Sequence, residues 1–208
     1  MSGILLINGS PHQNGCTNAA LEEMKRVFDA ADVNSEILWL GSKPMQDCIA
    51  CGNCRKSGKC AIDDAVNRVA AKLETFDGIV IGSPVYYSGA TGRLTSFLDR
   101  LFYSTPKKQF TGKLGAAVVS CRRAGSTATF QRLNQYFLIQ NMVVVGSQYW
   151  NEVHGHTAED VQKDEEGRQS LRTLALNMIW LLRCKEAGEK AGVKPPEYEP
   201  RVATDFIR

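Results

Sequence analysis

Five short apolar runs recur along the chain, and longer segments of mixed polar and charged residues separate them. The runs are continuously apolar and rich in Ile and Val, which is typical of strands that are buried on both faces of a parallel sheet. They cover residues 3–9, 35–40, 78–84, 114–121 and 142–150. We therefore predict five strands that alternate with helices.

The segments between the runs carry apolar residues at helical spacing. These helix faces comprise Leu21, Met24 and Phe28, then Leu94, Phe97, Leu98 and Leu101, and finally Leu171, Leu174, Met178 and Leu181. Alternating strands and helices with right-handed crossovers favour an α/β fold, an open and doubly wound sheet in three layers. Ligands of such sheets bind outside the carboxyl ends of the strands, so the loops that follow the strands are the candidate sites.

The composition indicates one soluble globular domain over residues 1–208. The chain carries 25 Lys and Arg against 22 Asp and Glu, a net charge of +3, without a basic stripe that would suit nucleic acid. Its first residues have no basic leader and only a short apolar run, so we expect a cytoplasmic protein with no membrane span. Residues 194–208 are expected to form an extended, proline-bearing arm that wraps the same domain or a neighbouring subunit.

The first loop, residues 9–18, has the residue types of a phosphate-binding turn. Ser10 and Thr17 offer hydroxyls, Gly15 lets the backbone turn tightly, and Thr17 is predicted to cap the helix that follows. The loop contains no Lys or Arg and matches neither the dinucleotide fingerprint nor the P-loop, so a simple monophosphate suits it best. An ordinary polar turn, with His12 exposed to solvent, is the alternative.

The loops after the third and fourth strands have the residue types of a site for a flat ring. Pro84 fixes the backbone, and Tyr86 and Tyr87 supply surfaces for stacking. Alternatively, one tyrosine belongs to the core and the other to the surface. Arg122 or Arg123 would stabilise negative charge on a ring or meet a nucleotide phosphate, unless both are solvated.

The stretch CIACGNCRKSGKC, residues 48–60, packs four of the seven cysteines into one loop with the spacing C-x2-C-x2-C-x5-C. In a reducing cytosol clustered thiols bind metal or do redox chemistry more often than they form disulfides. The short gaps are typical of a 4Fe-4S site, while zinc and free or redox-sensing thiols are the alternatives. The candidate metal ligands of this cysteine-rich loop, residues 44–63, are Cys48, Cys51, Cys54 and Cys60.

The segments GSPHQNGCTN and GSPVYYSGATGRLTSFLDR, together with the strand spacing, resemble the flavodoxin-like NADPH-dependent FMN reductase superfamily. The resemblance implies a flavodoxin-like fold with a five-stranded parallel sheet of order 2-1-3-4-5, FMN as the cofactor and NAD(P)H as the electron donor. It also implies that the FMN phosphate binds at residues 10–18 and the isoalloxazine ring at residues 84–88. His12 stands where an arginine is common in the family, and Cys16 where an asparagine is common.

Within that superfamily, the cysteine-rich loop resembles the compact motif of the iron-sulfur flavoproteins, which lies between the second strand and the second helix. This likeness implies a 4Fe-4S cluster that passes single electrons to or from FMN. The candidate flavin-binding residues are Ser10, His12, Asn14, Gly15, Cys16, Thr17, Asn18, Pro84, Val85, Tyr86, Tyr87, Ser88, Gly89, Ser120, Cys121, Arg122, Arg123 and Gly125.

We therefore expect an FMN-dependent oxidoreductase that passes electrons between NAD(P)H or a redox protein and a small-molecule or protein acceptor. No side chain need act as an acid or base, because the flavin carries the chemistry and the backbone amides of residues 84–88 and one arginine polarise it. A cluster-free quinone, nitro or azo reductase is the nearest alternative, and a non-enzymatic flavodoxin-like carrier is the other. The family resemblance also implies a homodimer or homotetramer.

Overall fold

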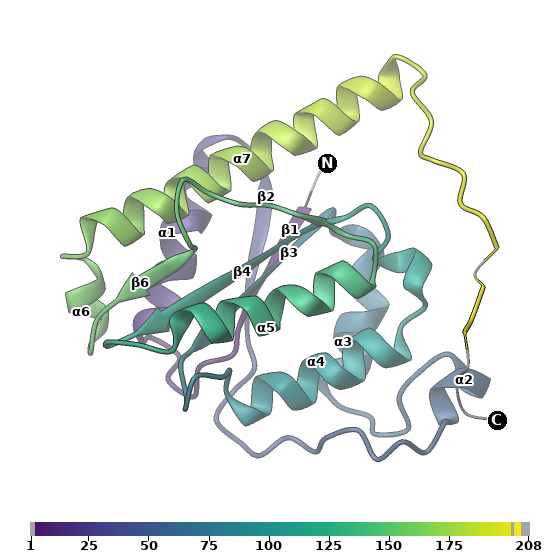
Figure 1. The fold of residues 1–208 in the computed structure, drawn as a ribbon, viewed down its shortest axis with the longest axis horizontal. Coiled ribbons are helices and arrows are strands. Elements are labelled where there is room, and N and C mark those ends of the chain that lie inside the picture. Colours follow the sequence, from purple (N-terminus) through teal and green to yellow (C-terminus); the bar gives the residue numbers. More distant parts are fainter. Residues whose placement is uncertain (1–2, 201, 205–208) are drawn as a thin grey trace.

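The computed structural model describes residues 3–200 and 202–204. A parallel sheet forms the middle of three layers (Figure 1), with the strand order β2-β1-β3-β4-β5 and a further strand, β6, that also pairs with β4. The strands are β1 Gly3–Asn8, β2 Asn34–Trp39, β3 Gly78–Pro84, β4 Leu114–Cys121, β5 Val143–Val144 and β6 Glu152–His154. The predicted α/β class and strand order are confirmed.

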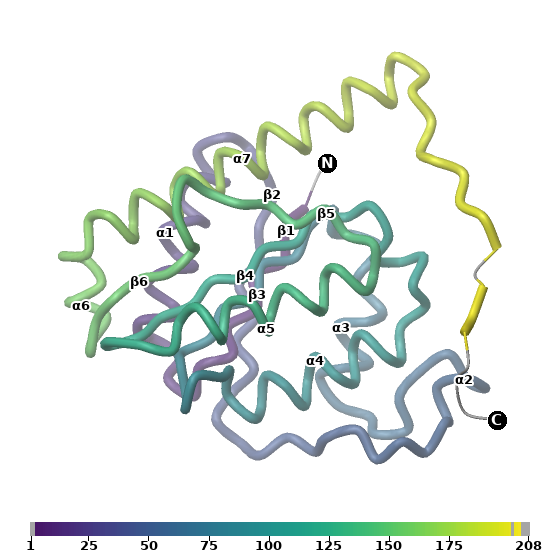
Figure 2. The backbone as a smooth tube through the Cα atoms, in the orientation of Figure 1, coloured from purple at the N-terminus to yellow at the C-terminus, as the bar shows by residue number. Residues whose placement is uncertain are grey.

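Helices cover both faces of the sheet (Figure 2). They are α1 Cys16–Ala30, α2 Asn53–Ser57, α3 Ala65–Lys72, α4 Gly92–Ser104, α5 Ser126–Ile139, α6 Ala158–Val161 and α7 Glu165–Lys190, with 3-10 turns at Leu73–Thr75 and Lys107–Gln109. Successive strand residues point to opposite faces, so Ile4 and Leu6 of β1 pack with α1 and α7, whereas Leu5 and Ile7 pack with α3, α4 and α5. Burial on both faces explains the apolar runs of β1, β3 and β4. The prediction of burial on both faces is wrong for β2 and β5, which are partly exposed.

The fifth position of the sheet is divided between two short strands, whereas the sequence predicts one strand over residues 142–150. β5 pairs with the start of β4, and β6 pairs with its carboxyl end. Between them the chain lies on α7, where Asn177 donates to the Gly146 carbonyl at 2.9 Å and Gln148 accepts from a threonine hydroxyl. The predicted count of five strands is wrong, because residues 146–148 bond to a helix instead of continuing the ladder.

Residues 40–64, the cysteine segment, join β2 to α3 and have α2 as their one helix. The segment passes α4 along the lower edge of the view in Figure 1, and α2 lies near the far end of that helix. Arg93 of α4 donates to the carbonyls of Ser42 and Lys43 at 2.7 and 2.8 Å. The cysteine segment is thus attached to a helix and contributes no strand to the sheet.

The chain after α7 is extended, and residues 194–200 are all exposed to solvent. The arm was predicted over residues 194–208, of which residues 201 and 205–208 lie outside the described residues. What the arm contacts stays a prediction. Among the helices that the structure describes, none is long and apolar enough to cross a membrane.

Candidate functional site

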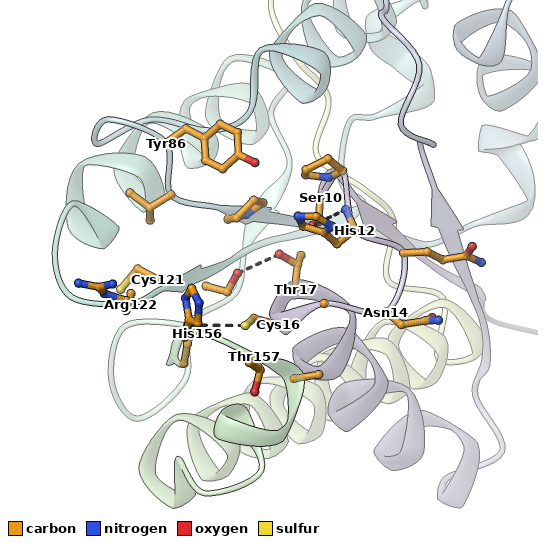
Figure 3. Close-up of a pocket in the computed structure, with 18 of the residues that line it drawn as sticks. Ser10, His12, Asn14, Cys16, Thr17, Tyr86, Cys121, Arg122, His156 and Thr157 are labelled. Carbon is orange, nitrogen blue, oxygen red and sulfur yellow. Dashed lines mark hydrogen bonds between the residues drawn. The ribbon is translucent and has the colours of Figure 1, made fainter.

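A cavity of about 750 Å³ opens at the carboxyl ends of β1, β3 and β4 (Figure 3). The loops that follow these strands line it, together with the β6–α6 loop and the end of β2. In Figure 3, Ser10, His12 and Thr17 lie on one side of the cavity, and Cys121 and Arg122 lie on the other. This is where doubly wound sheets bind ligands, and the volume suits a small-molecule cofactor.

The β1–α1 loop is held in place by Asn8, whose side chain is fully buried. Its carboxamide oxygen accepts from the Ser10 amide at 3.0 Å, and its nitrogen donates to the Gln13 carbonyl and the Asn18 side chain, each at 3.3 Å. The Ser10 hydroxyl in turn accepts from the His12 amide at 3.1 Å. One buried carboxamide therefore fixes the loop at three points.

Helix α1 begins at Cys16, and Gly15 is its N-cap residue, in an extended conformation and without a side-chain cap. The prediction that Thr17 caps this helix is wrong. Thr17 lies in the first turn, is buried, and places its hydroxyl 2.9 Å from the Ser120 hydroxyl of β4. Because the first amides of a helix have no partner within it, the start of α1 offers the cavity a site that favours an anion.

Trp39, the last residue of β2, also lines the cavity, and its indole N–H donates to the Ser10 carbonyl at 2.9 Å. The sequence predicts Trp39 only as part of the strand at residues 35–40. Its position at the carboxyl end of a predicted parallel strand was the signal that could have indicated a site residue. Trp39 therefore holds the β1–α1 loop from a second direction.

The β3–α4 loop folds into a two-residue hairpin between Tyr86 and Gly89. The amide of each residue donates to the carbonyl of the other, at 2.8 and 2.9 Å, and the central residues Tyr87 and Ser88 have φ angles of 49° and 60°. Such angles belong to a type I′ turn, which normally takes Asn and Gly, so this turn is strained. Gly125 packs against it, because a Cβ there would lie 2.8 Å from the Ser88 hydroxyl oxygen.

Some of the backbone amides that the sequence assigns to a bound ring are used within the protein. The Val85 amide donates to the Ser120 carbonyl at 2.9 Å, and the Tyr86 amide belongs to the hairpin. Proline has no amide hydrogen. Within the part of the chain that the structure describes, the amides of Tyr87 and Ser88 have no backbone partner. Of residues 84–88, only these two keep an amide without a backbone partner, and neither lines the cavity, so the predicted role of these amides as donors to a ring stays a prediction.

Two free thiols, Cys16 and Cys121, line the cavity. Burial raises the pKa of both thiols above the ordinary value. The Cys16 thiol also donates to the Gly155 carbonyl at 3.6 Å. Both side chains are therefore neutral at neutral pH and contribute surface to the cavity, not a reactive thiolate.

The β6–α6 loop forms a wall of the cavity that the sequence does not predict. Thr157 caps α6: its hydroxyl accepts from the Asp160 amide at 3.3 Å, and the Asp160 carboxylate accepts from the Thr157 amide at 3.2 Å. The residues of this loop that line the cavity are Gly155, His156 and Thr157, and Ala158 and Glu159 line it from the first turn of α6. Because β6 is only three residues long, no apolar run marks the loop in the sequence.

Most of the predicted cofactor residues line the cavity, and they are Ser10, His12, Asn14, Gly15, Cys16, Thr17, Pro84, Val85, Tyr86, Ser120, Cys121 and Arg122. The others do not line it, and they are Asn18, Tyr87, Ser88, Gly89, Arg123 and Gly125. Arg122 is the only Lys or Arg among the described residues that line the cavity. Of the two candidate arginines, the geometry therefore favours Arg122.

A second, smaller cavity lies beside the C-terminal half of α4, which contributes Arg100 and Tyr103 to its lining. The surface that these and the other lining residues present to the cavity is almost wholly apolar. The predicted metal ligands all line it, and they are Cys48, Cys51, Cys54 and Cys60. All are free thiols, so none forms a disulfide. Among residues 3–200 and 202–204, no three Cys, His, Asp or Glu side chains are arranged to hold a metal ion. The four thiols share a cavity without converging, and metal binding stays a prediction.

Comparisons with known proteins identify the family of the chain. The sequence profile of the family described as NADPH-dependent FMN reductase matches residues 3–157. An iron-sulfur flavoprotein of Methanocaldococcus jannaschii is 32% identical over 181 residues, which cover 82% of this chain and 92% of that protein.

Solved structures share the fold at low sequence identity. The structure of RosB with its bound intermediate 8-demethyl-8-formylriboflavin-5'-phosphate has a TM-score of 0.67 at 13% identity, covering 100% of this chain and 94% of that chain. A flavodoxin from the domain Archaea has a TM-score of 0.56 at 18% identity, covering 88% of this chain and 99% of that chain. Both likenesses concern the flavodoxin-like arrangement of the sheet and its helices.

Proposed function

Because this chain belongs to the flavodoxin-like NADPH-dependent FMN reductase family and to its iron-sulfur flavoprotein branch, we propose that it is an FMN-dependent oxidoreductase that passes electrons from NAD(P)H or a redox protein to an acceptor. The observation that carries the proposal is the cavity at the carboxyl ends of β1, β3 and β4, which joins the start of α1 to the strained hairpin after β3. Bound FMN would supply both hydride and single-electron chemistry.

The start of α1 supports a site for the FMN phosphate. The first amides of the helix and the hydroxyls of Ser10 and Thr17 are donors that phosphate oxygens accept from. Asn8 and Trp39 keep the loop in its shape before any ligand binds. Since the β1–α1 loop contains no Lys or Arg, oriented donors and not opposite charges would hold the phosphate.

The β3–α4 loop supports a site for the flat ring. Pro84 and Val85 give an apolar surface, and Tyr86 is 48% exposed at the cavity. The amides of Tyr87 and Ser88 have no backbone partner, but these two residues do not line the cavity, so Pro84, Val85 and Tyr86 carry the support for the ring site. Arg122 of the β4–α5 loop would balance negative charge that develops on the ring.

The cysteine cavity supports a 4Fe-4S cluster as a second redox centre. Four thiols around one apolar cavity are the donor set that such clusters use. Cys48 and Cys51 are exposed, and together with the half-buried Cys54 and Cys60 they would hold the cluster. A cluster there would supply one-electron transfer.

The two cavities lie at different ends of α4. Thr91, which caps the helix, and Arg100 are nine residues apart, or about 14 Å along the helix.

Anaerobic purification followed by flavin, iron and sulfide analysis tests the proposal. We expect about one FMN and about four irons per chain, and rapid, catalytic bleaching of the flavin by NADH or NADPH. Failure of the protein to bind FMN in a titration would refute the proposed function. Bound FMN without iron would instead assign a cluster-free reductase, and bound FMN that neither nicotinamide bleaches would assign an electron carrier.

A further inference from the structure

Arg100 of α4 is the largest almost fully buried side chain among the described residues. Every hydrogen bond of its guanidinium runs to the cysteine segment. Nε donates to the Cys60 sulfur at 3.3 Å, and Nη1 donates to the Gln46 carbonyl at 3.2 Å. Nη2 donates to the Ile62 carbonyl at 2.9 Å, and the two Nη atoms form a bidentate pair with the Asp64 carboxylate at 2.6 and 2.9 Å.

These partners lie on both sides of the four cysteines. Gln46 precedes the first cysteine, whereas Ile62 and Asp64 follow the last. One guanidinium therefore ties both ends of the cysteine loop to α4. A buried cation is unfavourable unless it is paired and hydrogen-bonded, and the fork of an arginine satisfies four separate groups as no other side chain does.

Cys60 is held more firmly than the other three cysteines. Asn67 of α3 accepts from the Cys60 amide and donates to the Cys60 carbonyl, each at 3.0 Å. Arg100 holds the sulfur of the same residue. In the part of the chain that the structure describes, no hydrogen bond reaches the sulfurs of Cys48, Cys51 or Cys54.

We propose that Arg100 is a positioning residue for the iron-sulfur site: it seats the cysteine segment on α4, makes Cys60 the anchored ligand, and raises the reduction potential of the cluster through its hydrogen bond to the Cys60 sulfur. The inference rests on the proposed function. A cluster gains negative charge on reduction, so a cationic donor at a ligating sulfur stabilises the reduced form.

The variant Arg100→Lys tests the positioning role, because a lysine keeps the charge but lacks the fork. Iron, sulfide and FMN per chain are measured in the anaerobically purified protein, and the midpoint potential of the cluster by redox titration. We expect Arg100→Lys to lose iron or to retain a cluster whose potential is more negative, at unchanged FMN content. Wild-type iron content together with a wild-type potential would overturn the proposal.

Two further variants separate the sulfur contact from other effects. Arg93→Gln changes an arginine of the same helix that bonds to the same segment without touching a sulfur, and we expect it to match the wild type in iron content and potential. Asp64→Asn keeps the Arg100 contact to sulfur and the N-cap of α3, so its potential should stay or rise. If the midpoint potential of either variant fell as far as that of Arg100→Lys, the assignment of the effect to the sulfur contact would be overturned.

If the wild-type protein binds FMN but carries no iron, the cluster and its potential are refuted. Proteolysis then tests the remaining part of the proposal, that Arg100 seats the cysteine segment on α4. Trypsin has sites inside the cysteine segment at Arg55, Lys56 and Lys59. We expect Arg100→Lys to be cleaved at these sites several-fold faster than the wild type, because the segment has lost its main attachment to α4. Equal cleavage rates would overturn the proposal, independently of the flavin site.

Discussion

The variant Asn8→Asp tests whether the buried carboxamide builds the proposed phosphate loop. Aspartate has the same shape and can still accept from the Ser10 amide, but it cannot donate to the Gln13 carbonyl or the Asn18 side chain, which Asn8 reaches at 3.3 Å. A buried polar group left without its partner costs about 1–3 kcal/mol. Gln13 is exposed and Asn18 is half-buried, so water can offset part of this loss, but the carboxylate that replaces the Asn8 side chain is itself fully buried. We put the total cost at about 2–4 kcal/mol.

Part of this cost should appear in FMN affinity, because the loop that loses its support is the one proposed to hold the phosphate. If about 1.4–2.8 kcal/mol of it falls on binding, the Kd for FMN rises roughly 10- to 100-fold. The assay is a titration of the flavin-free protein with FMN, followed by quenching of flavin fluorescence, with thermal unfolding measured in parallel.

Asn177→Asp is the matched control. Asn177 also donates to a backbone carbonyl, that of Gly146 at 2.9 Å, but it lies on α7 and does not line the cavity. We expect its Kd for FMN to equal that of the wild type. An Asn8→Asp protein that unfolds at a lower temperature yet binds FMN as tightly as the wild type would refute the link between Asn8 and the phosphate loop.

Three other substitutions test the ring site, the hairpin and the core. Tyr86→Ala should lower the FMN content of the purified protein, whereas Tyr87→Ala should keep it, because that side chain is fully exposed and does not line the cavity; equal losses would count against the ring site. Gly125→Ala places a Cβ 2.8 Å from the Ser88 hydroxyl oxygen at a φ of 87°, so its Tm should fall by an amount equivalent to about 1–3 kcal/mol, and an unchanged Tm would contradict the packing. Glu23→Gln should lower the free energy of unfolding in urea at pH 7 by about 2–4 kcal/mol, since three arginines of α1 and α7 lose a carboxylate that is 5% exposed. Burial opposes ionisation of Glu23, but hydrogen bonds from these arginines hold its pKa below the ordinary value. The stability that Glu23 contributes is therefore present above pH about 4.3 and is lost as the pH falls through the lower pKa of the folded state. A difference in unfolding free energy between wild type and Glu23→Gln that stays constant down to pH 3 would contradict this pH dependence.

The central strands could be predicted because they are buried on both faces and therefore read as unbroken apolar runs, whereas their order was implied only by the family resemblance. The edge could not, because the run at residues 142–150 is apolar at its start and polar at residues 146–148, which bond to α7. The β6–α6 loop could not be predicted either, because no apolar run marks the strand that precedes it. A strand of three residues, Glu152–His154, has no apolar signature.

The details of the site depended on contacts that are remote in the sequence. Threonine is a favoured N-cap residue, but Thr17 uses its hydroxyl to meet Ser120, which is 103 residues away. Arg100 meets partners that are 36 to 54 residues away, so nothing near it in the sequence indicates its role. The four cysteines, in contrast, reach one cavity because the short gaps between them keep them together.

The two cavities are attached to different parts of the molecule. The loops around the larger one leave strands whose side chains are buried. The cysteine segment is held by a few side chains of α3 and α4 and by three partly buried residues of its own that pack against the core, Leu40, Met45 and Cys60. Regions with few buried contacts open at a lower cost than global unfolding. Opening of the cysteine segment should therefore cost less free energy than unfolding of the sheet, so all four thiols could become exposed while the larger cavity keeps its shape.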